Sequence, residues 1–513
     1  AGSITLGSNT LTSGGSNANT TFSGVISGSS GNIVKAGSGT LTLTGNNTYT
    51  GSTTISAGLL KILRDNPTAY LAATSGFTGP GNLTIESAGD NFTADIVTGT
   101  HVQLAGTALG NLIIGKAGNT RQIDLSSNIT TTNIQTYNGP VRLVGGDRTV
   151  ATTNSNVVFA STVNSDGTQR ALTVTNGNGD TTFSGAIGGS APVKSLTITS
   201  DQLTAGAITL NGALTATLAN ASTISGVIAN GGGGTASLVK AGSGTLTLSA
   251  SNTYTGTTAI NAGDLTVSGS LHDSTAVSIA SGADYNVNAS DTVASIEGDG
   301  NIVLASSQTL TAGDGSDKTL GGVMSGAGNY IKAGSGTQTL TGANTYTGTT
   351  QVSAGTLTVS GSGRLSDDTA VTVDNGATYN VAVSDTVASI AGAGSITLGS
   401  NTLTSGGSNA STTFSGVLSG TNGNIVKAGS GTLTLSGANT YTGSTTISAG
   451  LLKVLRDDPT SYLAATSGFT GPGNLTIESA AGSFTADIVT GTHVQLAGTA
   501  LGNLIIGKAG NTR

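Results

Sequence analysis

The chain contains no cysteine, no tryptophan and only 6 prolines, and charged residues make up only 8% of it. The absence of cysteine excludes a scaffold held together by disulfides. So little charge argues against a helical bundle, which needs many Glu, Lys, Arg and Gln residues. The few prolines exclude collagen. Intrinsic disorder is excluded as well, because hydrophobic residues make up 36% of the chain.

The charge balance limits the partners of the chain. Its formal net charge is −7, and it lacks the basic patch that binds nucleic acid. No apolar run approaches the roughly 18 residues of a membrane helix. No basic-then-apolar signal segment opens the chain, so we expect any export signal or anchor to lie outside this segment. The sequence therefore predicts no nucleic-acid partner and no direct membrane insertion of this segment.

A long internal repeat organises the chain. Residues 1–121 recur as residues 393–513, and roughly 109 of the 121 positions are identical without a gap. Such self-similarity is the mark of a repeat architecture. We therefore interpret residues 1–392 as one long-period unit and residues 393–513 as the start of the next copy, both within a longer tandem array.

A shorter repeat is nested inside the long one. The sequence KAGSGTLTL begins at Lys35, Lys240 and Lys427, and KAGSGTQTL begins at Lys332. Each is followed by NTYTG, and SDTVASI occurs twice, 94 residues apart, within residues 238–426. The sequence therefore predicts modules of about 94 residues near positions 238–426.

Short stretches of period-2 alternation lie between turn signals. Thr40–Thr44 reads Thr-Leu-Thr-Leu-Thr, which is typical of a half-buried strand. The 81 glycines, together with Asn and Ser, interrupt such stretches every few residues. A sandwich or barrel has a fixed strand count, whereas a solenoid gains turns by repetition. The pattern therefore predicts an all-β solenoid with tandem repeats.

Two stretches resemble known families. The motif KAGSGTLTLTGNNTYTGSTTISAGLL closely resembles the passenger-associated repeat, an autotransporter-associated β-strand repeat of bacterial autotransporters. The stretch ITTTNIQTYNGPVRLVGGDRTV is more loosely similar to exoproteins of the filamentous-haemagglutinin type. These resemblances imply a right-handed parallel β-helix outside a Gram-negative cell, associated with its outer membrane. Passengers of this kind serve as adhesins, fibres or stalks, and some carry an enzyme domain at one end.

The sequence offers no clear catalytic, cofactor or metal site. His101, His272 and His493 lie in no metal-ligand spacing, and we expect them to be exposed polar residues. The acidic residues around Asp367, Asp457 and Glu297 are predicted to be solubilising charge, because adjacent acids on a strand point to opposite faces.

The residues of the short repeat have structural interpretations. The four repeated lysines are predicted to be exposed charges at strand ends that discourage edge pairing. The asparagines that precede Thr-Tyr in each repeat are predicted to form either stacked amide ladders or simple turns.

One segment interrupts the strand rhythm. Residues 59–82 recur as residues 451–474 with a few changes. Asn66 can cap a helix, Pro67 suits its first position, and the helix would span residues 68–73. We interpret both copies as side insertions, which either cover the core or form a contact protrusion. The candidate contact residues are Arg64, Asp65, Pro67, Tyr70, Phe77, Arg456, Asp457, Pro459, Tyr462 and Phe469.

The sequence favours a structural, non-enzymatic fibre or adhesin stalk that is part of a longer secreted protein. Its expected partners are further copies, joined end-to-end or laterally, or ligands on a host or surface. One alternative is an ice- or surface-binding threonine array, although the Thr-x-Thr pairs occur at irregular intervals in the sequence. Another alternative is a polysaccharide-active β-helix enzyme, which would need an acidic cleft.

Overall fold

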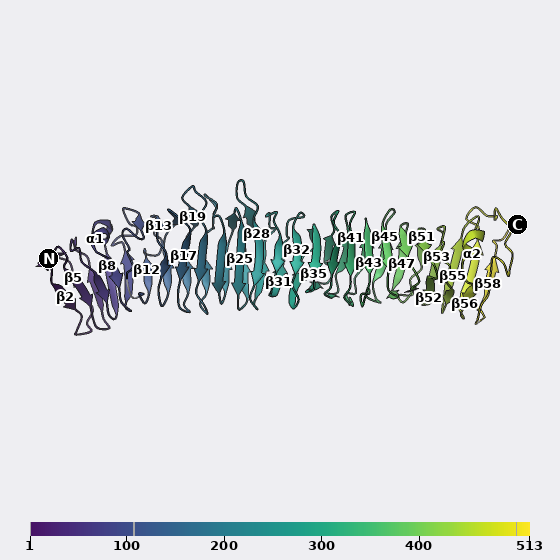
Figure 1. The fold of residues 1–513 in the computed structure, drawn as a ribbon, viewed down its shortest axis with the longest axis horizontal. Helices are drawn as coiled ribbons and strands as arrows, with labels where there is room; N and C mark the ends of the chain where they lie inside the picture. Colours follow the sequence, from purple (N-terminus) through teal and green to yellow (C-terminus); the bar gives the residue numbers. More distant parts are fainter. Residues whose placement is uncertain (1, 106–107, 499, 513) are drawn as a thin grey trace. The chain divides into compact units, whose positions relative to one another are not determined.

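The computed structural model describes residues 2–105, 108–498 and 500–512. The chain divides into two units. Unit 1 comprises Ala1–Thr258 and Gly263–Leu265, and unit 2 comprises Ala259–Ala262 and Thr266–Arg513. Both units consist of short parallel strands joined by turns, and the described residues contain two short helices, α1 and α2 (Figure 1).

Alternation along each strand explains why these residues form strands. In β6 (Thr40–Leu43) the two leucines are buried and the two threonines are half-buried. The same alternation occurs in β29 (Thr245–Leu248) and β53 (Thr432–Leu435). The inward leucines pack on like residues of the next turn, because Leu41 pairs in register with Leu60 and Leu43 with Ile62. Apolar burial along this column stabilises each turn against its neighbours.

Unit 1 contains two long parallel sheets, whose strands come from successive turns, and the second sheet begins at residue 129. In order of pairing, the first is formed by β3 (Thr20–Phe22), β6, β8 (Leu59–Leu63), β10 (Asn82–Glu86), β12 (Leu112–Ile114), β15 (Gln135–Tyr137), β18 (Val157–Phe159), β21 (Thr181–Phe183), β23 (Leu203–Ala205), β26 (Ser222–Ile224) and β29. The second is formed by β14 (Ile129–Thr130), β17 (Arg148–Ala151), β20 (Leu172–Thr175), β22 (Leu196–Ser200), β25 (Ala213–Leu218) and β28 (Ser237–Ala241).

Shorter sheets complete the turns of unit 1. They are formed by β1 (Ser3–Thr5) with β4 (Val25–Ser27), by β2 (Thr10–Ser13), β5 (Asn32–Lys35), β7 (Thr53–Ile55) and β9 (Phe77–Thr78), by β11 (Ile96–Val97), β13 (Ile123–Leu125), β16 (Val141–Leu143) and β19 (Val163–Ser165), and by β24 (Ile208–Leu210) with β27 (Ile228–Asn230).

Unit 2 has the same construction. One sheet is formed by β34 (Asp291–Val293), β37 (Thr309–Ala312), β40 (Asn329–Lys332), β42 (Thr350–Val352), β44 (Ala370–Val373), β47 (Ser389–Gly392), β50 (Thr412–Phe414), β53, β55 (Leu451–Leu455), β57 (Asn474–Glu478) and β58 (Leu504–Ile506). Another is formed by β32 (Ala276–Ile279), β35 (Ser295–Gly298), β38 (Lys318–Leu320), β41 (Thr337–Leu340), β43 (Thr356–Val359), β45 (Thr378–Val381), β48 (Ser395–Thr397) and β51 (Val417–Ser419).

The remaining strands of unit 2 pair in two sets. They are formed by β33 (Ala283–Val287), β36 (Asn301–Leu304) and β39 (Met324–Gly326), and by β46 (Asp385–Val387), β49 (Thr402–Ser405), β52 (Asn424–Lys427), β54 (Thr445–Ile447) and β56 (Phe469–Thr470). Two further strands, β30 (Thr258–Ile260) and β31 (Gly263–Val267), lie where the chain passes from one unit to the other.

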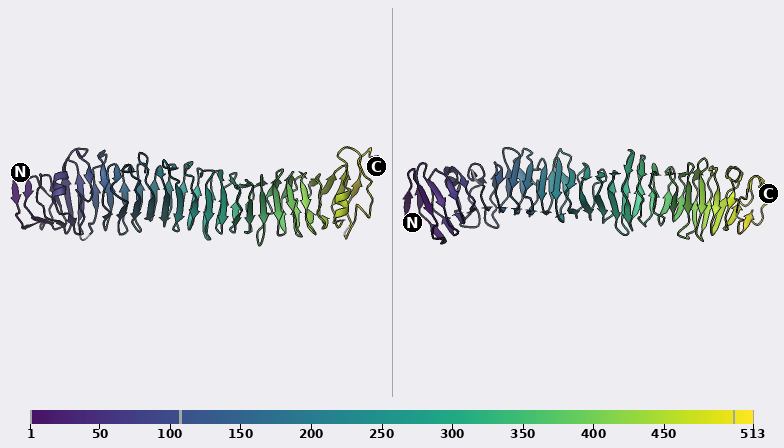
Figure 2. Two further views of the ribbon diagram at one scale, coloured as in Figure 1. Left: turned by 45° about the horizontal axis from the view of Figure 1, so that its top comes forward. Right: turned by 60° about the horizontal axis from the view of Figure 1, so that its bottom comes forward.

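Within each unit the chain coils so that strands of successive turns stack in register (Figure 2). Every strand pair that the structure describes is parallel, for example β5 with β7 and β52 with β54. Because each turn pairs with the turn before and after it, its backbone groups are satisfied by its neighbours. The predicted all-β parallel solenoid is confirmed.

Candidate functional site

The lysines of the short repeat are buried, not exposed. Lys35, Lys240, Lys332 and Lys427 expose at most 1% of their surface. The prediction of exposed strand-end charges was therefore wrong. The strand β40 explains the burial, because Tyr330 and Lys332 are two residues apart and both point inward.

The buried ammonium groups of Lys35, Lys332 and Lys427 are each held by backbone carbonyls from two successive turns. The Nζ of Lys332 donates to the carbonyl oxygens of Ala333 at 2.6 Å, Gly334 at 2.9 Å and Ala354 at 3.2 Å. Lys35 has the equivalent three acceptors. Burial lowers the pKa of these lysines, and that of Lys240 falls to about 8. These ammonium groups hold the turns together and cannot reach a ligand at the surface.

The repeated asparagines bond to backbone, not to one another. Asn344 Oδ1 accepts the amide hydrogen of Met324, one turn earlier, at 2.8 Å. Its Nδ2 donates to the carbonyl oxygens of Gly342 and Arg364. Asn47, Asn252 and Asn439 accept an amide hydrogen of the preceding turn in the same way. These buried side chains therefore link successive turns, and they form neither a stacked amide ladder nor a simple exposed turn.

The tyrosine of each repeat adds a further buried polar group to these lysines and asparagines. The hydroxyl of Tyr441 lies 2.7 Å from that of Thr445 and 2.6 Å from that of Tyr462. Tyr49 makes the same contacts with Thr53 and Tyr70. Burial raises the pKa of Tyr441 well above its ordinary value, so its hydroxyl stays protonated. All ten tyrosines of the chain are buried.

Two buried aspartates belong to the SDTVASI repeats and were missed by the sequence analysis. Asp291 and Asp385 are 4% and 3% exposed. The hydroxyl of Tyr285 donates to Asp291 at 2.7 Å, and that of Tyr379 donates to Asp385. Burial raises the pKa of both carboxyl groups to about 6. The signal was present in the alternation, because each aspartate lies two residues before a buried valine.

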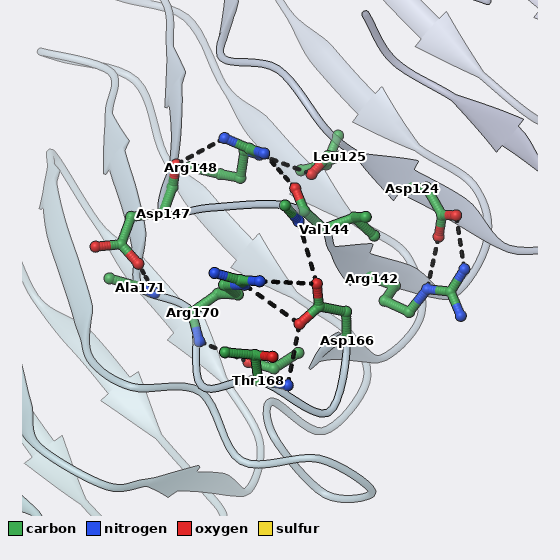
Figure 3. Close-up of polar contacts among 12 residues, drawn as sticks. Asp124, Leu125, Arg142, Val144, Asp147, Arg148, Asp166, Thr168, Arg170 and Ala171 are labelled. Carbon is green, nitrogen blue, oxygen red and sulfur yellow. Dashed lines mark hydrogen bonds and ion pairs between the residues drawn. The ribbon is translucent and has the colours of Figure 1, made fainter. Parts of the chain in front are cut away.

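A cluster of charged side chains occupies residues 124–194 of unit 1 (Figure 3). Asp124 of β13 and Arg142 of β16 lie opposite each other in register. Their side chains form a bidentate ion pair, with Nε to Oδ1 at 2.9 Å and Nη2 to Oδ2 at 2.7 Å. Arg170 pairs with Asp166 at 3.2 Å, and this interaction lowers the pKa of Asp166 to about 2.

The rest of this cluster is also paired internally. Arg148 donates to the carbonyl oxygens of Leu125, Val144 and Asp147. The carboxylate of Asp147 accepts the amide hydrogen of Ala171 and lies 3.6 Å from the Nζ of Lys194. Each charge therefore has a partner of opposite sign or a backbone acceptor. A charged ligand would have to displace these pairs, so the cluster acts as a brace between turns.

The segment around residues 59–82 contains the helix α1 (Thr68–Ala73), and its second copy contains α2 (Thr460–Ala465). Pro67 stands at the N-terminal boundary of α1. The side chain of Asn66 accepts the amide hydrogen of Thr68 at 3.2 Å, and Asp458 does the same for Thr460 at 3.0 Å.

Most candidate contact residues in this segment point inward. The buried ones are Pro67, Tyr70, Phe77, Pro459, Tyr462 and Phe469. Tyr70 and Tyr462 pack on the repeat tyrosines, with ring centroids 5.5 Å apart in each pair. These six residues therefore contribute to the core and cannot form a contact surface. The other four, Arg64, Asp65, Arg456 and Asp457, remain accessible at the rim of the segment.

The histidines are half-buried, not fully exposed. The Nδ1 of His101 accepts the amide hydrogen of Val97, and His493 does the same for Val489.

The acids Asp367 and Asp368, which are adjacent in the sequence, are exposed. Among the described residues, no group of three or more His, Cys, Asp or Glu side chains could hold a metal ion. No helix in the described part of the chain is long and apolar enough to cross a membrane.

Comparison with known proteins agrees with this geometry. The family described as Passenger-associated-transport-repeat matches residues 33–62, 238–267, 331–359 and 425–454. Each match contains one of the four buried lysines and one of the four asparagines that link successive turns. The chain is also 39% identical over 134 residues to the adhesin BmaC autotransporter of Brucella suis biovar 1 (strain 1330). That similarity covers 24% of this chain and 4% of the adhesin.

No solved structure matches the chain. The four repeat matches cover the solenoid turns whose buried Lys, Asn and Tyr side chains are described above. The chain carries four passenger-associated-transport-repeats, and its resemblance to bacterial autotransporter passengers is confirmed.

Proposed function

We propose that the chain is a structural stretch of a secreted passenger that forms an adhesin stalk or fibre at a bacterial cell surface. The inward direction of the repeat's polar side chains carries this proposal. Lys332, Asn344 and Tyr346 make their hydrogen bonds to other atoms of the solenoid. Side chains that hold turns together supply stiffness and leave no catalytic constellation at the repeat.

The resemblance to an adhesin supports the surface role. The curated relative is named as an adhesin and an autotransporter, and the match spans a small part of its length. A passenger of this kind acts outside the cell, so we propose an extracellular location. A stalk needs length, which tandem turns provide. The paired charges of residues 124–194 support a mechanical role, because they brace neighbouring turns.

Two kinds of partner fit a stalk. The first is a second copy of the chain, joined laterally or end-to-end. The second is a ligand on a host or other surface, contacted through Arg64 and Asp65 and through Arg456 and Asp457. These side chains recur in both copies of the segment, so weak contacts would be multiplied by repetition.

Adhesion of beads coated with the purified chain to cell monolayers and to abiotic surfaces tests this function. A variant with alanine at Arg64, Asp65, Arg456 and Asp457 should adhere less. The matched control carries Arg142→Ala and Asp124→Ala, which remove one internal pair and should leave adhesion unchanged. Coated beads that adhere no better than uncoated beads would contradict the adhesin role. Analytical ultracentrifugation that shows only monomers over the whole concentration range would contradict self-association.

A further inference from the structure

Unit 1 carries an outward face formed by two columns of threonine. Strands β20, β22 and β25 each contain a Thr-x-Thr sequence. The strand register places Thr173 opposite Thr197 and Thr197 opposite Thr215. The second column is formed by Thr175, Thr199 and Thr217. We call these six residues the threonine face.

The irregular sequence intervals between these pairs disappear in the fold. The loops between β20, β22 and β25 differ in length, yet the three strands pair without a shift in register. Extra residues lie in the turns and do not displace the strands. Neighbouring strands lie about 4.8 Å apart and alternate residues about 6.7 Å apart. The threonine face is therefore a regular two-dimensional array, which the sequence spacing had argued against.

The hydroxyl groups of this array are free to bind outside the protein. None of the six has a hydrogen-bond partner among the described residues, and Thr175 is exposed while the other five are half-buried. Beneath them, alternate residues such as Leu196, Ile198 and Leu214 are fully buried. Threonine is β-branched and stiff at χ1, so a packed strand fixes the position of each hydroxyl and methyl group.

The chemistry of the face selects its partner. The two columns continue into Thr149 and Ala151 on one side and into Val239 and Ala241 on the other. They contain no charge, so an ionic ligand finds no counter-charge there. They also contain no aromatic ring on which a sugar could stack. What remains is a rigid lattice of hydroxyl and methyl groups, whose complement is another uncharged, repeating lattice of hydrogen-bonding groups.

We propose that the threonine face binds the surface of ice. Ordered water bridges protein groups nearly as well as direct hydrogen bonds do, but each bridging molecule loses entropy when it is immobilised. In ice that ordering already exists, and the face offers fixed hydroxyls in two rows. Unit 2 has the same strand register, with Thr337 and Thr339 of β41 opposite Thr356 and Thr358 of β43, and there the hydroxyl of Thr358 accepts a hydrogen bond from Asn380. This activity is independent of the adhesion proposed above.

Inhibition of ice recrystallisation and thermal hysteresis by the purified chain test the proposal. The face variant carries lysine at four array positions, namely Thr197, Thr215, Thr339 and Thr358. The control variant carries four lysines on a single column of another sheet of unit 1, at Thr182, Thr204, Thr223 and Thr247. The wild type and the control variant should inhibit ice growth, and the face variant should lose most of that inhibition.

Circular dichroism establishes that each variant keeps its strands. A second face variant with valine at the same four positions retains the side-chain shape, removes only the hydroxyls and should inhibit less than the wild type. A wild type without effect on ice, or a folded face variant as active as the wild type, would overturn the proposal. So would a wild type that leaves ice unaffected but sediments with crystalline chitin or cellulose, or that pairs with a second copy through this face.

Discussion

Replacement of Lys332 by methionine tests whether the buried ammonium holds two turns together. Its Nζ donates to three carbonyl oxygens, two in the turn that follows β40 and one, that of Ala354, in the next turn of the solenoid. Methionine has a similar length and packs well in apolar surroundings. The change therefore removes the charge and its hydrogen bonds while it leaves little empty space.

The expected magnitude follows from opposing terms. Hydrogen bonds to a charged group contribute about 1.5–3 kcal/mol each. The burial of an ammonium group costs several kcal/mol, which offsets a large part of that gain. The variant leaves three carbonyl oxygens without this donor, and each unsatisfied group costs about 1–3 kcal/mol. We therefore expect Lys332→Met to lower the local free energy of unfolding by about 3 kcal/mol.

Hydrogen exchange measured by mass spectrometry is the suitable assay. A long solenoid opens locally, so a single global unfolding free energy is not defined for it. The amide of Ser353 donates to the carbonyl of Lys332 and reports on this pair of turns. A loss of about 3 kcal/mol corresponds to roughly a hundredfold faster exchange. Peptides from unit 1 should exchange at the wild-type rate.

The matched control is Lys61→Met. Lys61 is 29% exposed and pairs with Glu86 at 2.7 Å, so its loss should change stability by no more than about 1 kcal/mol. If Lys332→Met accelerates exchange around residue 332 no more than Lys61→Met accelerates it around residue 61, the three carbonyl contacts of Lys332 contribute nothing to stability. An increase in exchange rate spread evenly over unit 2 would also refute the reasoning, because the contacts of Lys332 join only two turns.

Three further predictions concern unit 2. Burial raises the pKa of Asp385 from its ordinary 3.8 to about 6, so the folded state binds the proton more tightly. The contribution of Asp385 to stability should therefore be fully present below pH 4 and be lost as pH rises through 6. Asp385→Asn should remove this part of the pH dependence of the urea midpoint followed by circular dichroism. Asp367 adds repulsion at this site, and an unchanged pH dependence would contradict the assignment. In Gly437→Ala the new Cβ would lie 1.6 Å from the carbonyl oxygen of Gly416, so hydrogen exchange around this site should show a loss of several kcal/mol of local stability. The control Gly407→Ala meets no atom within 4 Å and should exchange at the wild-type rate. Tyr462→Phe removes the hydroxyl bonded to Tyr441 and should lower local stability by about 1 kcal/mol in hydrogen exchange. Tyr330→Phe removes a buried hydroxyl without a partner in the described structure and should leave local exchange unchanged or slower.

The class of fold follows from the amino-acid pattern alone. The alternation of Thr and Leu in residues 40–44 fixes which side chains point inward, and the close repetition of residues 1–121 requires an architecture that grows by added turns. The same alternation contained the directions of the buried ionisable residues. Lys35 lies two residues after Ile33, and Asp291 lies two residues before Val293, so each shares the inward face. The usual exposure of charged residues suggested the opposite for the lysines.

Only the tertiary structure decided where these inward groups find partners and which outward groups form a surface. The acceptors of Lys332 include Ala354, and Asn344 accepts from Met324, a turn earlier. Such contacts depend on the stacking of turns, which the length of each loop does not reveal. The alignment of Thr173, Thr197 and Thr215 depends on it as well. Loops absorb differences in length while backbone hydrogen bonds keep strands in register, so irregular spacing in the sequence becomes a regular array in space.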